Sequence, residues 1–311
     1  MIRTVLGDIE PKELGYTLCH EHFIIDLDRV RKDGVSKIET IEEVEPEIKL
    51  AMEQGIKSAI EVSTIDLGRD IKKLVQISKD TKLNIIASTG FYLSEYHPDY
   101  LKDLSTEEVS NIYIKELTEG IDGTGVKAGI IAEIASNKNE FIGEEEKILR
   151  AAALASNKTG AAVSTHTNRP NGIKTVEILL SEGINPDKVI IGHQDLIDDV
   201  DYHESILKYG VNIGFDTCGK SAYMPDETRA RNIIELVNRG YGDHILLSND
   251  VSRRTYFTSF KGPGYTAVMG NVVPLLSWLS TVIVPLCASI ILRLSDKPIP
   301  ILVGFNEFSP L

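Results

Sequence analysis

The stretch 129–165, GIIAEIASNKNEFIGEEEKILRAAALASNKTGAAVST, contains the structural unit that recurs through the chain. It begins with a short apolar run, Gly129–Ile134, and continues into an amphipathic segment with a period near 3.6 residues, Glu144–Asn157. It ends in a second apolar run, Ala162–Thr165. Compact runs rich in β-branched residues are typical of strands that are buried on both faces. A strand, a helix and a strand in this order predict two parallel strands joined by a helical crossover.

The same unit recurs along most of the chain. The apolar runs predicted as strands are Tyr16–Cys19, Ile56–Val62, Asn84–Ser88, Gly129–Ile134, Ala162–Thr165, Val189–Ile191, Val211–Phe215 and Ile245–Leu247. The amphipathic segments predicted as helices are Ile41–Gln54, Asp70–Thr81, Thr106–Thr118, Glu144–Asn157, Gly172–Glu182, Asp201–Tyr209 and Thr228–Arg239. Eight units in about 250 residues predict an α/β protein with a single-domain (β/α)8 TIM barrel. An open doubly wound sheet is the alternative, but it usually carries a Gly-rich phosphate loop after its first strand, and this sequence has none.

Composition limits the classes of function. The chain has 311 residues, of which 42% are hydrophobic and 25% charged, as is ordinary for a globular protein. Its formal net charge of −13 argues against nucleic acid as a partner. The cysteines Cys19, Cys218 and Cys287 lie far apart, as expected in a reducing compartment. The N-terminal sequence MIRTVLGDIEPKELGYT has no basic-then-apolar signal pattern, so we predict a cytoplasmic protein.

The end of the chain departs from the barrel pattern. Residues 262–292 contain no charged side chain, and VVPLLSWLSTVIVPLCASIIL (272–292) is long enough to span a bilayer. We therefore expect a barrel over 1–276 and a divergent apolar C-terminal tail over 277–311. Three explanations of the tail stay open: a shifted reading frame near codon 277, a divergent buried helix, and a membrane anchor. Pro274, Pro285 and the lack of basic flanks argue against the anchor, so no membrane partner is expected.

Polar side chains follow several predicted strands, where TIM-barrel enzymes carry their active sites. His20 and His22 come directly after the first strand and point to one face, because strand side chains alternate. Glu133 interrupts the fourth apolar run, where a carboxylate is costly unless it is paired, for example with Lys127, or binds a metal. The fifth, sixth and eighth strands are followed by His166, His193 and Asp250.

Imidazoles and carboxylates are the ligands of Zn²⁺ and similar divalent cations. Taken singly, each residue has a structural alternative: surface or core histidines, an ion pair for Glu133, and a helix N-cap for Asp250. The six together exceed what one tetrahedral site needs, whereas two cations bridged by a carboxylate and a hydroxide use them all. The sequence therefore predicts two divalent cations, with Zn²⁺ preferred and Mn²⁺ or Co²⁺ as alternatives.

The motifs of residues 2–276 also resemble a known family, the phosphotriesterase-related branch of the amidohydrolase superfamily. The matching phrases are CHEH (19–22), STGFY (88–92), KAGII (127–131), THT (165–167), GH (192–193), FDTCGK (215–220), S-x-D (248–250) and DVSRR (250–254). The resemblance implies that one cation, the more buried, is held by His20, His22 and Asp250. It assigns the second cation to His166 and His193.

The bridging ligand is the point at which the chain departs from the best-known members of that family. They use a carboxylated lysine, whereas here AEI follows KAGII. A sub-branch that the chain resembles more closely has glutamate there, which implies Glu133 as the bridge. Lys127, six residues earlier at the beginning of the strand, is the alternative.

The function implied by the resemblance is metal-dependent hydrolysis of a small molecule. A metal-bridging hydroxide would attack an ester, lactone or phosphoester, and Asp250 would pass its proton to the leaving group. Arg253 and Arg254 could clamp a substrate carboxylate or phosphate, and Tyr92 could cap the cations, unless these side chains belong to a solvated loop and a packed rim. An amidase or deaminase of the same superfamily, and a barrel that binds metal without turnover, are the alternatives. A homodimer is left open.

Overall fold

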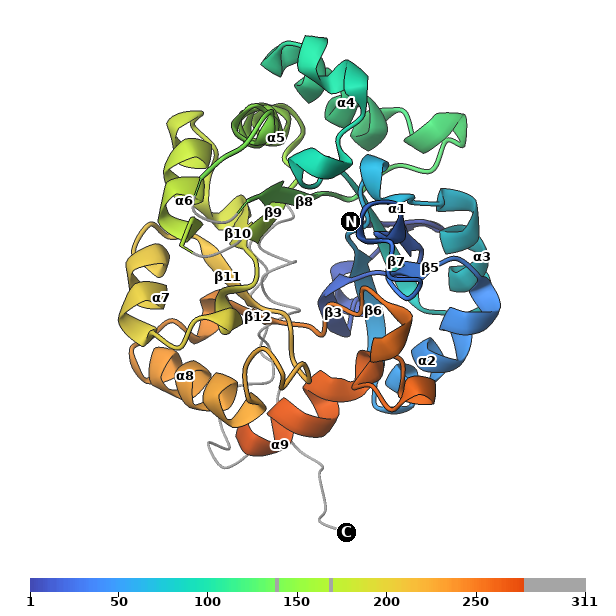
Figure 1. The fold of residues 1–311 in the computed structure, drawn as a ribbon, viewed down its shortest axis with the longest axis vertical. Coiled ribbons are helices and arrows are strands. Elements are labelled where there is room, and N and C mark those ends of the chain that lie inside the picture. Colours follow the sequence, from blue (N-terminus) through green and yellow to red (C-terminus); the bar gives the residue numbers. More distant parts are fainter. Residues whose placement is uncertain (138–139, 168–169, 277–311) are drawn as a thin grey trace.

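A parallel sheet surrounded by helices forms the body of the molecule, shown in Figure 1. The computed structural model describes residues 1–137, 140–167 and 170–276. Its central sheet has eight strands, which are β3 (Tyr16–Glu21), β6 (Ile56–Glu61), β7 (Asn84–Thr89), β8 (Ile130–Ser136), β9 (Val163–Thr167), β10 (Val189–Ile191), β11 (Asn212–Phe215) and β12 (Ile245–Leu247). Neighbours in the sheet are neighbours in the chain, and every pair is parallel. This arrangement confirms the predicted TIM barrel.

Seven helices lie outside the strands, as the sequence pattern predicts. They are α2 (Ile41–Glu53), α3 (Ile71–Thr81), α4 (Thr106–Thr118), α5 (Glu145–Thr159), α6 (Gly172–Ser181), α7 (Val200–Leu207) and α8 (Asp226–Asn238). Local capping defines where several of them begin. The side chains of Thr40 and Ser105 accept hydrogen bonds from the amides of Glu43 and Glu108, and each glutamate caps back in return.

The barrel interior is apolar below the polar strand ends. Ile60, Ile86, Ile130, Ile190 and Leu246 are all buried and pack in one cluster inside the ring of strands. These residues alternate with outward-facing ones that pack against the helices, as in other (β/α)8 barrels. The core therefore fills the barrel and leaves its carboxyl end for polar groups.

The seam between β12 and β3 is closed by hydrogen bonds that join the end of β3 to the end of β12 and to the loop that follows β12. The His20 amide donates to Ser248 Oγ at 3.0 Å, and the Asp250 amide donates to the His20 carbonyl at 3.2 Å. Cys19 Sγ donates to the Leu247 carbonyl at 3.3 Å. This closure places the first strand of the barrel beside the loop that follows the last one.

Short elements that the periodicity did not reveal cover parts of the barrel. They are β1 (Ile2–Thr4), β2 (Gly7–Ile9), β4 (Ile25–Asp26), β5 (Lys37–Ile38), α1 (Asp28–Arg31), α9 (Val273–Leu276) and several single turns. Runs this short do not complete a period of hydrophobic alternation. The expected tail, 277–311, and its three explanations lie outside the described residues. Within the part of the chain that is described, no helix is long and apolar enough to cross a bilayer.

Candidate metal centre

Four imidazoles surround one carboxylate at the carboxyl end of the barrel. Glu133 Oε2 lies 3.2 Å from His20 Nε2, 3.1 Å from His166 Nδ1 and 3.9 Å from His193 Nε2. Glu133 Oε1 lies 3.4 Å from His22 Nε2. The side chains come from β3 and the residue directly after it, from β8 and β9, and from the turn after β10. The barrel thus brings together residues up to 173 positions apart in the chain, from 20 to 193.

The loop after β12 adds a second carboxylate. Asp250 Oδ1 lies 3.3 Å from His22 Nε2, and its other oxygen forms a close ion pair with Lys220 Nζ. Two groups of possible ligand atoms have all their members within 4.8 Å of one another. One consists of His20, His22 and Asp250, and the other of His20, Glu133 and His193.

The donor set fits divalent cations. Both ring nitrogens of His20 are buried without a hydrogen-bond partner, although carboxylate oxygens lie close to each. Buried polar atoms are normally hydrogen-bonded, so two buried ring nitrogens without a hydrogen-bond partner are suited to bind another group. Imidazole nitrogen and carboxylate oxygen at these separations are the ligand types that Zn²⁺ takes.

The charges of the cluster oppose the effect of burial. Burial raises the pKa of Glu133, but the charges and hydrogen bonds of His166 and His20 outweigh it and hold the pKa well below its usual range. Burial lowers the pKa of His20, but the charges of Glu133 and Asp216 raise it to about 10. Glu133 is therefore an anion, and a cation that binds His20 takes the place of its proton.

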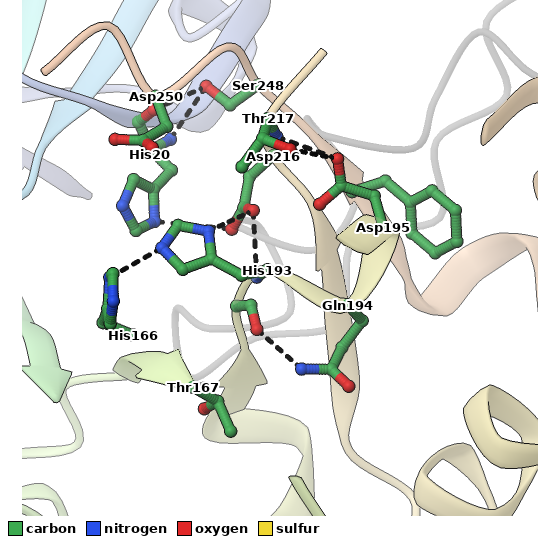
Figure 2. A network of polar contacts seen from close by, with 12 residues as sticks. His20, His166, Thr167, His193, Gln194, Asp195, Asp216, Thr217, Ser248 and Asp250 are labelled. Carbon is green, nitrogen blue, oxygen red and sulfur yellow. Dashed lines mark hydrogen bonds and ion pairs between the residues drawn. The ribbon is translucent and has the colours of Figure 1, made fainter. Parts of the chain in front are cut away.

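Side chains behind the imidazoles hold two of the rings in place. Ser63 Oγ donates to Glu61 Oε1 at 2.6 Å and lies 2.9 Å from His22 Nδ1. Because its only proton goes to Glu61, Ser63 accepts the Nδ1 proton and leaves His22 Nε2 free to bind. Asp216 Oδ1 likewise lies 2.8 Å from His193 Nδ1, as Figure 2 shows, and such partners orient metal-binding histidines.

A pocket of about 480 Å³ lies over the cluster, and its lining holds three basic side chains against the two carboxylates of the cluster. Arg31, Lys220 and Arg253 line it together with Tyr92 and Tyr256. The Tyr92 hydroxyl lies 3.3 Å from His166 Nε2, and Lys220 Nζ lies 4.5 Å above the ring centre of Tyr256. The walls therefore present cations and hydroxyl groups to whatever sits above the histidines.

Comparison with known proteins agrees with this geometry. A family model described as "Phosphotriesterase family" matches residues 1–281. The chain belongs to the phosphotriesterase family.

Two curated relatives match this phosphotriesterase-family chain over most of their length. The chain is 34% identical over 247 residues to the aryldialkylphosphatase of Saccharolobus solfataricus, covering 78% of each protein. It is 27% identical to the N-acetyltaurine hydrolase of Xenopus tropicalis, covering 88% of this chain and 90% of that protein.

Solved structures share the barrel. The phosphotriesterase homology protein from Escherichia coli, complexed with phosphate in its active site, superposes with a TM-score of 0.84 at 33% identity, covering 88% of this chain and 94% of the other. A lactonase from Listeria monocytogenes gives a TM-score of 0.84 at 29% identity, covering 90% and 91%. A hydrolase of this family is the function class that these relatives support.

In this member of the phosphotriesterase family, two side chains lie away from the positions expected from the sequence. Arg254 does not line the pocket with Arg253, because its Nε pairs with Glu43 Oε1 on α2 at 2.6 Å. The Arg254 side chain therefore lies outside the pocket, and a contact with substrate is proposed for Arg253 alone of the two. Lys127 lines a cavity at the opposite end of the barrel, next to Ile130 at the beginning of β8. It is too far from the histidines to act as the alternative bridge.

Several residues near the cluster were not predicted from the sequence. Asp216 directly follows a buried strand, which is the same signal that identified the histidines, but no ligand was expected from the seventh strand. Ser63 and Glu61 adjoin the end of β6 in the same way. Arg31 gave no signal, because α1 is too short to show a period. Polar residues at the end of any barrel strand can therefore belong to the site.

Proposed function

We propose that the protein is a binuclear metal-dependent hydrolase that cleaves an ester, lactone or phosphoester bond. The observation that carries the proposal is the position of Glu133. One of its oxygens faces His22, and the other faces His20 and His166. A carboxylate with imidazoles on both oxygens is suited to bridge two cations, and it carries the same charge as the carboxylated lysine of other family members.

The remaining ligands divide between the two positions. We assign His20, His22 and Asp250 to the more buried cation, and His166 and His193 to the second, with Glu133 shared. Bound there, two divalent cations, with Zn²⁺ preferred, would acidify a water molecule and polarise the oxygen of the scissile bond.

Asp250 is the residue proposed to move the proton. Burial raises its pKa, but the charge of Lys220 and a hydrogen bond from His22 hold the pKa well below its usual range. The anionic carboxylate faces the pocket, where it can accept the proton of the attacking water and deliver it to the leaving group.

The pocket favours a substrate that carries an anionic group. Arg31, Lys220 and Arg253 give its lining three positive charges against the two carboxylates Glu133 and Asp250. Lys220 is paired with Asp250, so Arg31 and Arg253 are the groups that remain to bind an anion. Guanidinium groups pair well with carboxylates and phosphates. The phosphate described in the active site of the Escherichia coli relative supports this preference. An amide is the second candidate, because the N-acetyltaurine hydrolase is a relative over 88% of this chain.

A substrate panel tests the proposal. The protein is dialysed against a chelator and assayed with γ-lactones, carboxylic esters, phosphomonoesters, phosphotriesters and N-acyl aminosulfonates, each with and without Zn²⁺, Mn²⁺ or Co²⁺. We expect turnover of at least one ester class that is lost on chelation and restored by metal. Turnover of the aminosulfonates alone would favour the amidase. Two tightly bound cations without turnover would favour a binding protein, and metal content far below one per chain would contradict the proposal.

Two adjacent arginines offer a matched test of the anionic substrate. We expect Arg253→Gln to raise KM for an anionic ester by about 10-fold or more, since hydrogen bonds to charged groups contribute about 1.5–3 kcal/mol. KM for its neutral analogue should change little. Arg254→Gln is the control, because Arg254 pairs with Glu43 outside the pocket. Equal effects of the two substitutions, or equal effects on charged and neutral substrates, would refute the clamp.

A further inference from the structure

Asp216 lies behind the candidate metal centre, after a strand from which no ligand is proposed. It directly follows β11 and is 1% exposed. Its Oδ1 accepts hydrogen bonds from the amide of His193, at 2.9 Å, and from His193 Nδ1, at 2.8 Å. Its Oδ2 lies 3.4 Å from Nδ1 of a second imidazole, that of His20. One carboxylate therefore faces two rings that come from opposite parts of the chain, as Figure 2 illustrates.

The surrounding backbone is shaped to hold this carboxylate. A Cβ atom on Gly214 would lie 2.4 Å from Asp216 Oδ2, and one on Gly192 would lie 3.1 Å from the same oxygen and 2.1 Å from the Thr165 carbonyl. The 2.4 Å contact would displace the Asp216 carboxylate, and the 2.1 Å contact would be with backbone, which cannot yield that far. His193 itself has a left-handed backbone with φ of 58°, which turns both its amide and its ring toward Asp216. The two glycines therefore leave room for the Asp216 side chain, and the left-handed turn at His193 brings its hydrogen-bond donors to that side chain.

Asp216 lies beside Nδ1 of His20 and of His193, which is the side of each ring that faces away from the proposed cations. Nε2 of His20 faces Glu133 Oε2 at 3.2 Å, and Nε2 of His193 lies 3.9 Å from the same oxygen. Asp216 accepts a hydrogen bond from His193 Nδ1, which keeps the proton there and leaves Nε2 for a metal. Its Oδ2 approaches His20 Nδ1 without a hydrogen bond, yet it is an acceptor beside that nitrogen and favours the same tautomer in the second ring.

We propose that Asp216 is a positioning residue shared by both cation positions, holding one histidine of each. This inference rests on the proposed binuclear site, in which His20 belongs to the more buried cation and His193 to the second. Because the same carboxylate orients both rings, loss of the contact to one imidazole disturbs the other.

The other two imidazoles show that this sharing is specific. His22 Nδ1 has its own partner, Ser63, which is tied to Glu61. The ring of His166 lies beside the Tyr92 hydroxyl and contacts His193 Nε2 at 2.7 Å through its Nδ1. Neither of these two rings contacts Asp216. A substitution of Asp216 should therefore act directly on His20 and His193 alone.

Three variants separate the positioning role from a general loss of stability. Asp216→Ala removes both acceptors. Asp216→Asn keeps one acceptor and places an NH₂ group opposite the other ring. Glu116→Gln is the control, since Glu116 is a largely buried carboxylate on the outer helix α4, where it pairs with Arg69 and not with the histidines. Circular dichroism and thermal melts show whether each variant is folded.

Two measurements are made on the folded proteins. Zn²⁺ content and affinity are determined by chelator competition, where we expect Asp216→Asn to weaken binding by about 10- to 100-fold. Long-range ¹H–¹⁵N spectra of histidine-labelled, metal-free protein report the protected Nδ1 protons. We expect signals for His20 and His193 in the wild type, loss of one in Asp216→Asn, loss of both in Asp216→Ala, and no change in Glu116→Gln.

The two measurements distinguish failure of the positioning role from failure of the proposed metal-dependent function. If the wild type binds Zn²⁺ and Asp216→Asn binds two ions within about threefold of the wild-type affinity, the shared positioning role is wrong. Unchanged Nδ1 signals in Asp216→Ala overturn it as well. If the wild type binds no metal, the proposed hydrolase fails, while the Nδ1 signals still decide whether Asp216 orients the two rings.

Discussion

Replacing Glu133 by glutamine is expected to remove one of the two cations and to abolish most hydrolytic activity. Glutamine keeps the size of the side chain but offers one neutral oxygen where two anionic oxygens face His22, His20 and His166. Outer partners of metal ligands typically contribute 10- to 100-fold to metal affinity, so loss of the bridging ligand should exceed about 100-fold. The loss of kcat should be at least as large, because a single cation no longer holds both water and substrate.

Metal analysis and kinetics check this expectation together. Glu133→Gln, Glu116→Gln and the wild type are dialysed against equal free Zn²⁺, and bound metal is counted by mass spectrometry. We expect two ions in the wild type and in Glu116→Gln, and at most one in Glu133→Gln. Two tightly bound ions in Glu133→Gln with kcat within about threefold of the wild type would show that Glu133 is not the bridge.

Replacing Asp250 by asparagine is expected to lower kcat by about 10²- to 10⁴-fold, the usual contribution of a general acid or base. Asparagine keeps an oxygen near His22 Nε2, which Asp250 Oδ1 approaches at 3.3 Å, but it cannot accept and return a proton. The substitution also leaves Lys220 without its anionic partner in the pocket. The loss should therefore depend on how much the leaving group needs a proton.

A series of esters with different leaving groups makes that dependence measurable. We expect Asp250→Asn to slow esters of alkyl alcohols far more than nitrophenyl esters, whose leaving groups depart as stable anions. Metal content is measured in parallel, because Asp250 is also a proposed ligand. An equal loss for all leaving groups, with the full complement of metal, would show that Asp250 does not deliver a proton to the leaving group.

Most of the barrel could be predicted from the chain itself. The apolar runs and amphipathic segments end within two residues of the observed strands and helices, for example at α2 and β12. Such elements are set by local periodicity and by caps such as Thr40, which depend on neighbours in the sequence. The convergence of the six candidate ligands was also predictable, because the carboxyl ends of all strands meet at one end of a closed barrel.

Side chains in the connecting loops could not be placed this way. Arg253 and Arg254 are adjacent, yet one enters the pocket and the other pairs with Glu43. Their directions depend on the backbone of an irregular loop and on which distant charge lies nearest. The roles of Asp216 and Ser63 likewise depend on rings that reach them from other strands.

The sequence alone therefore determined the order of strands and helices, the barrel, and the end of the barrel at which imidazoles and carboxylates gather. Only the tertiary structure decided which atoms face one another: Glu133 between the histidines, Asp216 behind two of them, and Arg31 beside Lys220 and Arg253 in one pocket. The physical reason is the separation along the chain of the residues that interact. Secondary structure is set by contacts a few residues apart, whereas the geometry of the site depends on distances between segments that meet only when the barrel closes.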